Sequence, residues 1–290
     1  MGSRLRKRQA RRKRRLVDNA NRDQRRVDLH MHSTLSDGIL SIGELLESCA
    51  RGKLDIISIT DHDMAPEVPY GPHVFQEHTL WHIHGVELTT CYAGQDIHLL
   101  AYFPKEMPPT MRLFCRQQAI RRAVRYDELV SKLGLAGIEG APLKAHAGQC
   151  AMTRLQLAKE IIRLGYASSI QQAFVQYIKN INLESRFPSI EEMVTLVKNS
   201  GGIISWAHPD VQNARKWAGH FSSLGLDALE AYRPLKQKKY RKSIKEIARQ
   251  HNLHVTGGSD SHGWGEKLGT FAFPAEEIRS WAGRFIAFDT

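Results

Sequence analysis

The sequence of 290 residues contains only four cysteines, and none is paired with another in a Cys-x-x-Cys motif. They lie far apart, at Cys49, Cys91, Cys115 and Cys150. Four scattered cysteines without a Cys-x-x-Cys pair argue for free thiols, and against a disulfide framework or a zinc finger as the basis of the fold. Scattered thiols are typical of a reducing compartment, so we expect a cytoplasmic protein.

The sequence also lacks the apolar stretches that membranes and export require. No apolar run approaches the roughly 20 residues that span a bilayer. The charged N-terminus has no apolar segment of a signal peptide. With 42% hydrophobic and 24% charged residues, the composition is that of a globular chain. We therefore predict no membrane partner.

The positive charge is concentrated at one end of the chain. Residues 1–26 hold twelve Lys and Arg and two acidic residues, which gives +10 of the total net charge of +11. Because this stretch is rich in charge and poor in apolar residues, we predict a disordered basic arm. Such an arm attracts nucleic acid by neutralising phosphates. A solubilising tail and an address signal are the alternative interpretations.

Short apolar runs alternate with amphipathic stretches over the rest of the chain. Strands are predicted at Arg26–His32, Ile56–Thr60, Leu80–Thr89, Ile97–Phe103, Gly202–Ala207, Ala228–Ala231 and His254–Gly257. Helical periodicity is found at Leu40–Arg51 and Ile190–Asn199, among others. Repeated strand–helix units predict an α/β fold whose parallel sheet is open or closed into a barrel.

The alternation is interrupted by a stretch that shows helical periodicity only, at Leu113–Leu133, Arg154–Leu164 and Ser169–Ile178. Proline-containing turn signals stand on both sides of it. We therefore predict three parts. They are the basic arm 1–26, an α/β body made of 27–109 and 187–290, and a helical insertion at 110–186.

Side chains that can bind metal stand near the ends of the predicted strands. His30 and His32 alternate along one strand, so both lie on one face. The other candidates are Asp37, His62, Glu87, His98, His208, Asp260 and His262. Strand ends converge at one edge of an α/β sheet, so we expect these side chains to meet. Six imidazoles and three carboxylates exceed one tetrahedral site and suit two or three ions of Zn, Mn or Fe.

The charge of such a cluster favours an anionic substrate. Three carboxylates contribute three negative charges, whereas three divalent ions would contribute six positive ones. Clustered ions also lower the pKa of bound water and clamp the attacking and leaving oxygens. We therefore predict phosphoester hydrolysis by a metal-bound water, without a covalent enzyme intermediate.

The order and spacing of these motifs resemble the PHP (polymerase and histidinol phosphatase) superfamily. The motifs are His30-x-His32, Ser36-Asp37-Gly38, Thr60-Asp61-His62-Asp63, Gly85-Val86-Glu87, Ala207-His208-Pro209 and Gly258-Ser259-Asp260-x-His262-Gly263. The helical insertion and the strings at 165–169 and 225–230 are similar to one branch. That branch contains bacterial 5′→3′ exoribonucleases and nucleoside 3′,5′-bisphosphate phosphatases. Ser261 stands where relatives often carry an aromatic residue.

The resemblance implies a distorted (β/α)7 barrel of the PHP type with an inserted α-helical subdomain. It also implies three divalent metal ions, with Mn²⁺ expected and Fe²⁺ or Zn²⁺ as alternatives. Carried over by motif, the ligand sets are His30, His32, Glu87 and Asp260; Asp37, His62 and His262; and His98 and His208 with Glu87 shared as a bridge. Asp61 would orient a ligand and not bind metal itself.

Arginines of the insertion are the candidates for binding substrate. Arg154 resembles the phosphate-binding arginine of the branch, and its planar fork suits a phosphate. Arg121, Arg122 and Arg125 form either a basic wall over the site or a solvated helix face, and Arg122 is the second candidate. A later run, 236–242, tracks an RNA backbone with Tyr240 stacked on a base, or is a solvated helix face.

We predict a metal-dependent phosphoesterase that acts on nucleotide phosphates. The expected substrates are short RNA attacked from its 5′ end, a nucleoside 3′,5′-bisphosphate, or both. A small-metabolite phosphatase of the histidinol-phosphate type is the first alternative. A non-catalytic nucleic-acid-binding protein is the alternative of another class, and the complete set of nine ligands argues against it.

Overall fold

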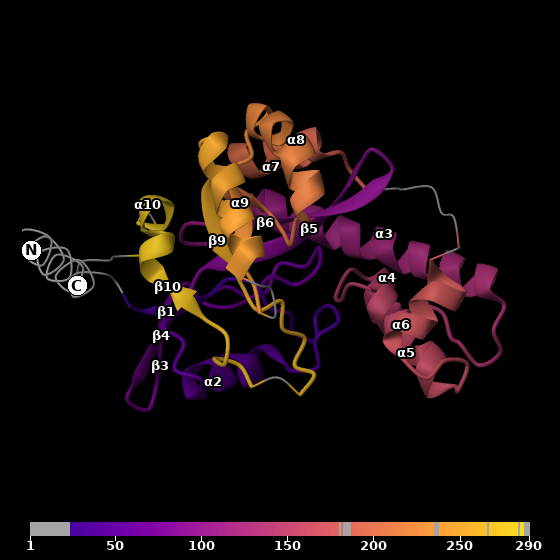
Figure 1. The fold of residues 1–290 in the computed structure, drawn as a ribbon. Helices are drawn as coiled ribbons and strands as arrows, with labels where there is room; N and C mark the ends of the chain where they lie inside the picture. The colour runs from indigo at the N-terminus through magenta and orange to yellow at the C-terminus, as the bar shows by residue number, and fades with distance from the viewer. Residues whose placement is uncertain are drawn as a thin grey trace, which may run out of the picture.

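The computed structural model describes residues 24–179, 181, 187–234, 238–265, 267–283 and 285–286. Most of the predicted basic arm, residues 1–23, lies outside this part of the chain, as does Lys236 of the second basic run. The described strands form two five-stranded sheets with helices packed on them, and further helices extend to one side (Figure 1). The mixed α/β architecture expected from the sequence is confirmed.

The first sheet has the strand order β10-β1-β2-β4-β3. Its strands are β1 (Arg26–Asp28), β2 (Ile56–Ile57), β3 (Gly71–Phe75), β4 (His78–His82) and β10 (Phe273–Pro274). The three central strands run parallel, and both edge strands are antiparallel. Arg26 belongs to this sheet and not to a free arm, since its backbone N donates to Asp55 Oδ2 at 2.6 Å.

The second sheet has the order β5-β6-β7-β8-β9. Its strands are β5 (His84–Tyr92), β6 (Gln95–Phe103), β7 (Ile203–Trp206), β8 (Ala228–Tyr232) and β9 (His254–Gly257). β6 runs antiparallel to both β5 and β7, and β7, β8 and β9 run parallel to one another. The single strand predicted at Leu80–Thr89 was wrong. The chain changes sheets at Ile83, which lies between two histidines and two positions before Gly85.

Two isolated parallel bridges join the sheets, Met31 to Ser261 and His62 to Glu87. The first is extended by Asp260 N, which donates to His30 O at 2.8 Å. Between these points the ladders of the described residues do not form a continuous seven-stranded barrel. The bridges nevertheless bring the ends of β1, β2, β5 and β9 to one edge of the molecule.

Helices cover both sheets and enclose the core. α2 (Ile42–Arg51) packs on the first sheet and begins at Ser41, which forms a capping box with Glu44. On one face of the second sheet lie α7 (Ile190–Asn199), α8 (Val211–Leu224) and α9 (Lys238–Gln250), with α10 (Arg279–Ala282) beside β10 (Figure 1). The main core lies beneath α7–α9, where the apolar side chains of β5–β9 are buried.

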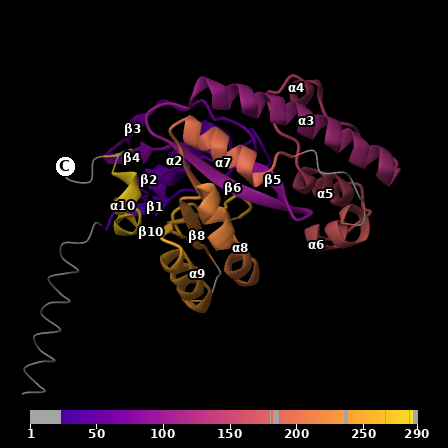
Figure 2. The same cartoon turned by 90° about the horizontal axis from the view of Figure 1, so that it is seen from above.

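The predicted insertion is helical and lies at one end of the molecule (Figures 1 and 2). Its elements are α3 (Pro109–Leu133), α4 (Leu143–His146), α5 (Arg154–Arg163), α6 (Ile170–Ala173) and a π-helical turn at Phe174–Ile178. It has a small apolar core of its own, centred on Leu157 and Ile161. Among the described helices, none combines the length and the apolar character that crossing a bilayer requires.

Candidate metal centre

A ring of histidines surrounds the carboxylate of Glu87, which β5 places in the fully buried interior. Its Oε2 lies 3.3 Å from His30 Nε2, 3.3 Å from His32 Nε2 and 3.1 Å from His62 Nδ1, and its Oε1 lies 3.0 Å from both His98 Nδ1 and His208 Nε2. Five imidazoles that are far apart in the sequence thus converge on one acidic side chain.

The remaining predicted ligands complete the same cluster. Asp260 Oδ1 lies 3.3 Å from His32 Nε2 and 3.5 Å from His30 Nε2. Asp37 Oδ1 lies 3.3 Å from His262 Nε2, and Asp37 Oδ2 lies 3.7 Å from His62 Nε2. The structure therefore brings together all nine side chains that the sequence analysis singled out, and three overlapping groups of them could each hold an ion.

The backbone at the strand ends is shaped to present these ligands. β6 runs antiparallel to β5 and pairs His98 with Thr89, so the start of β6 meets the end of β5. His208 and Asp260 have φ values of 35° and 54°, which are uncommon for residues other than glycine. Gly258 packs so closely that a Cβ would lie 2.2 Å from the Cβ of His30. Such strain is typical of functional sites.

Four buried atoms of the cluster have no hydrogen-bond partner among the described residues: His30 Nε2, His32 Nε2, His62 Nδ1 and Glu87 Oε2. An unpaired buried polar atom costs about 1–3 kcal/mol. All four face one another, and imidazole nitrogens with a carboxylate oxygen suit Zn, Mn or Fe. The donor set therefore fits a divalent cation.

The electrostatics of two members of the cluster, Glu87 and His62, agree with this fit. Burial alone would raise the pKa of Glu87, but His62, His30 and His98 hold it well below its usual value. Burial lowers the pKa of His62 well below that of a free imidazole. Ionised carboxylates and neutral imidazoles are the forms that ligate metals.

Asp61, the predicted orienting residue, is buried behind the ligands. It accepts hydrogen bonds from Ser33 N at 2.8 Å, Ser33 Oγ at 2.6 Å and Ser36 Oγ at 2.6 Å. Asp61 therefore ties the loop that carries Asp37 to the end of β2.

Sequence reasoning missed a second buried carboxylate that holds ligands in place. His30 Nδ1 donates to Glu230 Oε1 at 2.9 Å, and the backbone N of His208 donates to Glu230 Oε2 at 2.7 Å. Arg233 Nη2 in turn donates to Asp260 Oδ2 at 2.8 Å. The bond to Nδ1 leaves the Nε2 lone pair of His30 facing the cluster. An acidic residue inside the apolar run of β8 was the signal in the sequence.

We expect Glu230→Gln to lower metal affinity by about 10–100-fold, because an amide has one acceptor oxygen and cannot accept from both His30 Nδ1 and the backbone N of His208. Calorimetric titration of the metal-free protein with Mn²⁺ measures this change. Glu246→Gln, at an exposed position on α9 beside Arg249, is the matched control. Equal Mn²⁺ affinities of wild type and Glu230→Gln would contradict the orienting role.

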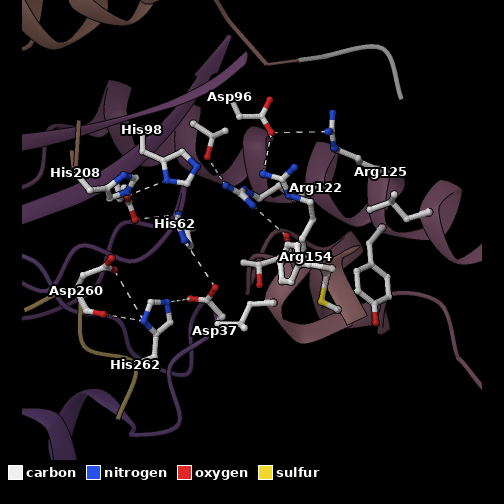
Figure 3. A pocket seen from close by; sticks show the side chains of 18 residues that line it. Asp37, His62, Asp96, His98, Arg122, Arg125, Arg154, His208, Asp260 and His262 are labelled. Atoms are coloured by element: carbon white, nitrogen blue, oxygen red, sulfur yellow. Dashed lines mark hydrogen bonds and ion pairs between the residues drawn. The ribbon is translucent and has the colours of Figure 1, made fainter. Parts of the chain in front are cut away.

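A cavity of about 300 Å³ opens in front of the cluster (Figure 3). The histidines and carboxylates form one side of it, and Arg122, Arg125, Arg154 and Asp96 lie on the other. Apolar side chains of the insertion complete the lining, namely Tyr126, Leu129, Met152, Leu155 and Phe174. The insertion thus supplies the wall that faces the metal ligands.

The two predicted substrate-binding arginines occupy different environments. Arg154 Nη2 lies 3.1 Å from Asp96 Oδ2, and its side chain is half exposed to the cavity. Arg122 is buried, with Nε donating to Asp63 Oδ2 at 2.6 Å, Nη1 to Met152 O at 3.2 Å and Nη2 to Thr89 Oγ1. Arg122 therefore lines the cavity with its donors already engaged.

Arg125 is an arginine that the sequence analysis left undecided. Its Nη2 lies 4.0 Å from Asp96 Oδ2. Its Nη1 is buried without a hydrogen-bond partner among the described residues. The guanidinium carbon also lies 4.9 Å from the centroid of the Phe187 ring. Arg125 thus lines the cavity from a fixed position, and its unpaired donor Nη1 is buried beside it.

The family model of the PHP domain matches residues 28–251. The chain belongs to the PHP domain family. Among PHP relatives, the 5′-3′ exoribonucleases Rnm of Salmonella typhimurium (strain LT2) and Escherichia coli (strain K12) are each 30% identical to this chain over 249 residues. These alignments cover 81% of this chain and 84% of either relative. The 3′,5′-nucleoside bisphosphate phosphatase of Chromobacterium violaceum is 21% identical over 251 residues, 83% of this chain and 88% of its own.

Solved structures support the same fold. A protein from Bifidobacterium adolescentis superposes with a TM-score of 0.72 at 22% identity, covering 90% of this chain and 97% of its own. The predicted PHP membership and hydrolase class are thereby confirmed.

A pair of histidines and a tyrosine that could have contributed to the site lie outside it. His82 and His84 are buried and pack edge to face, 5.1 Å apart, outside the ligand groups. The hydroxyl of Tyr240 donates to Pro209 O at 2.8 Å, and the ring packs against the main core. This anchoring argues against a base-stacking role for Tyr240.

Proposed function

We propose that this PHP protein hydrolyses nucleotide phosphoesters, acting on short RNA from its 5′ end and on nucleoside 3′,5′-bisphosphates. The observation that carries the proposal is the cluster of nine candidate ligands, seven of which line one cavity opposite the arginines. With metal ions held on one side and arginines on the other, this cavity would favour a substrate with two phosphate groups. The names of the exoribonuclease and phosphatase relatives support this substrate class.

One reaction serves both substrates. In each, water adds to the phosphorus, the bond from phosphorus to the 3′-oxygen breaks, and that oxygen leaves with a proton. The nucleoside 5′-monophosphate is released from either substrate. The phosphoryl group becomes inorganic phosphate from a bisphosphate and the new 5′-phosphate of a shortened RNA.

The residues would hold three ions in the sets implied by the motifs: His30, His32, Glu87 and Asp260; Asp37, His62 and His262; and His98 and His208 with Glu87. When bound, divalent ions supply Lewis acidity and activate water at neutral pH. Mn²⁺ is the proposed ion, with Fe²⁺ or Zn²⁺ as alternatives. Glu230 and Asp61 orient this shell from behind.

Arg154 and Arg125 would bind the 5′-phosphate, since a guanidinium pairs with phosphate through two parallel N–H bonds. Arg122 would support them from its place between α3 and the sheet. Asp96 lies beside both arginines and would hold their guanidinium groups in the cavity when no phosphate is bound.

We expect Arg154→Ala to raise KM for adenosine 3′,5′-bisphosphate on the order of tenfold. This factor corresponds to the free energy that one hydrogen bond to a charged group contributes to binding. The KM for adenosine 3′-phosphate, which lacks the 5′-phosphate, should change little. Steady-state phosphate release measures both. Arg163→Ala, at an exposed position of the same helix beside Glu160, is the control. A similar loss on both substrates would remove Arg154 from the 5′-phosphate site.

The proposal is tested by incubating Mn²⁺-loaded protein with adenosine 3′,5′-bisphosphate, a 5′-phosphorylated RNA oligomer and histidinol phosphate in parallel. Stepwise release of mononucleotides establishes the exoribonuclease, and phosphate release from the bisphosphate establishes the phosphatase. Turnover of histidinol phosphate alone would overturn the substrate class. RNA binding without any turnover would support the non-catalytic alternative.

Three finer expectations complete the proposal. The basic arm, now without the strand residue Arg26, would contact nucleic acid through its charge. The two bridges, Met31 to Ser261 and His62 to Glu87, support treating the two sheets as parts of one distorted (β/α)7 barrel. The four free cysteines agree with a cytoplasmic location.

A further inference from the structure

A second, smaller cavity adjoins the metal centre. Its volume is about 210 Å³, and its lining consists of Leu155, Lys159, Ile170, Asp260, His262 and Trp264. Leu155, Asp260 and His262 also line the larger cavity, so the two cavities meet at the metal ligands. None of the arginines of the larger cavity lines the smaller one, so a group bound there lies away from the proposed 5′-phosphate site.

The most unusual member of this lining is Trp264, which leaves 53% of its surface exposed. It stands in the loop after β9 that also carries the ligands Asp260 and His262. Gly263 and Gly265 on either side have φ values of 81° and 70°, conformations that glycine adopts without strain. The loop thus holds an indole at the edge of the metal centre, where it does not contribute to the described core.

Lys159 connects this tryptophan to the site. Its Nζ lies 3.9 Å from the centroid of the Trp264 ring and donates to Asp37 O at 3.0 Å. A positive charge therefore lies over one face of the half-exposed indole and next to the loop of a candidate metal ligand. Basic and aromatic side chains in this combination bind single-stranded nucleic acid, with the cation near the backbone and the ring against a base.

The two proposed substrates differ in one group only. Up to the attacked phosphorus they share the same 5′-phosphorylated nucleoside, but in RNA that phosphorus also carries a second nucleoside. The smaller cavity is below the roughly 300–1,000 Å³ of a site for a drug-sized ligand. It suits a single ring system and lies directly beyond the metal ligands.

We propose, building on the proposed function, that Trp264 with Lys159 and Ile170 forms a stacking site for the base of the second nucleotide of RNA. The base lies against the indole, and Lys159 stands beside the backbone that leads to it. This site favours RNA over a nucleoside bisphosphate, because only RNA fills it.

The test compares wild type, Trp264→Ala and Trp264→Phe, each loaded with Mn²⁺. Hydrolysis is measured on adenosine 3′,5′-bisphosphate, on a 5′-phosphorylated adenosine dinucleotide, and on the same dinucleotide without its second base. Affinity for a dinucleotide with a non-hydrolysable methylene phosphonate linkage is measured in parallel. Val74→Ala, an exposed apolar residue on β3, is the control.

We expect Trp264→Ala to lower the preference for dinucleotide over bisphosphate on the order of tenfold and to weaken analogue binding by a similar factor. Trp264→Phe should keep most of the preference for dinucleotide over bisphosphate. Wild type and Trp264→Ala should hydrolyse the dinucleotide without its second base equally well. Equal analogue affinities, or an equal loss on both substrates, would overturn the stacking site. Absence of turnover by wild type would instead refute the proposed function, while the analogue binding still decides on Trp264.

Discussion

Glu87→Gln should lower kcat/KM by at least about 10³-fold, a loss of roughly 4 kcal/mol in transition-state stabilisation. The carboxylate lies at the centre of the cluster, with its two oxygens within 3.3 Å of five imidazoles. The amide keeps the shape of the side chain but removes the charge and one acceptor oxygen. It therefore weakens the binding of every ion that Glu87 would hold, including two ions that it would bridge. Phosphate release from adenosine 3′,5′-bisphosphate measures the loss.

The fold should survive this change, since glutamine fills the same volume in the same strand. Circular dichroism and the melting temperature of the metal-free protein check this point. Glu47→Gln, on the exposed surface of α2 beside Arg51, is the matched control and should keep full turnover. If Glu87→Gln retained most of its turnover, the cluster would not be the catalytic centre.

The gathering of the candidate metal ligands was predictable because its signal is local and repeated. Each ligand stands next to a short apolar run, and the rule that strand ends converge at one edge needs no knowledge of the exact strand pairing. His98 is an exception to this rule. It lies near the start of its strand, yet the antiparallel pairing of β5 with β6 brings it to the same edge.

The supporting residues could not be predicted, because their roles depend on contacts between distant segments. Glu230 meets His30 across 200 positions of the chain, and Arg122 meets Asp63 across 59. Arg122 and Arg125 lie on one helix, and nothing in their spacing distinguishes the engaged guanidinium from the one with a free donor. Only the packing of α3 on the sheet determines which is which.

The strand at Leu80–Thr89 illustrates a different limit. The chain leaves one sheet and enters another at Ile83, and a single glycine, Gly85, is the only turn-type residue near this point of the sequence. The backbone N of Ile83 still donates to Ile57 O at 2.9 Å. The hydrogen bonding of the first sheet therefore continues to the residue at which the chain leaves it. The boundary is set by the tertiary pairing of β4 and β5 and not by local propensity.

Removal of metal should strongly lower both turnover and the thermal stability of the protein. Chelation followed by desalting should abolish turnover, and added Mn²⁺ should restore it. An ion present at 100 times its Kd stabilises the native state by about 2.7 kcal/mol. At about 2–4 °C for each kcal/mol, the melting temperature should rise by about 5–10 °C on loading. Scanning calorimetry of both forms measures this shift.

The physical reason lies in the four buried atoms that face one another without hydrogen-bond partners in the described part of the chain. Bound cations would satisfy these atoms, because His30, His32 and Glu87 belong to one proposed ligand set and His62 to another. The metal-free cluster instead leaves the carboxylates of Glu87 and Asp260 close together. Glu87→Gln gives the internal comparison, because it removes the shared ligand. Its melting temperature should respond to Mn²⁺ much less than that of wild type. Full turnover after exhaustive chelation, or equal melting temperatures of the loaded and metal-free wild type, would show that the cluster does not hold a stabilising ion.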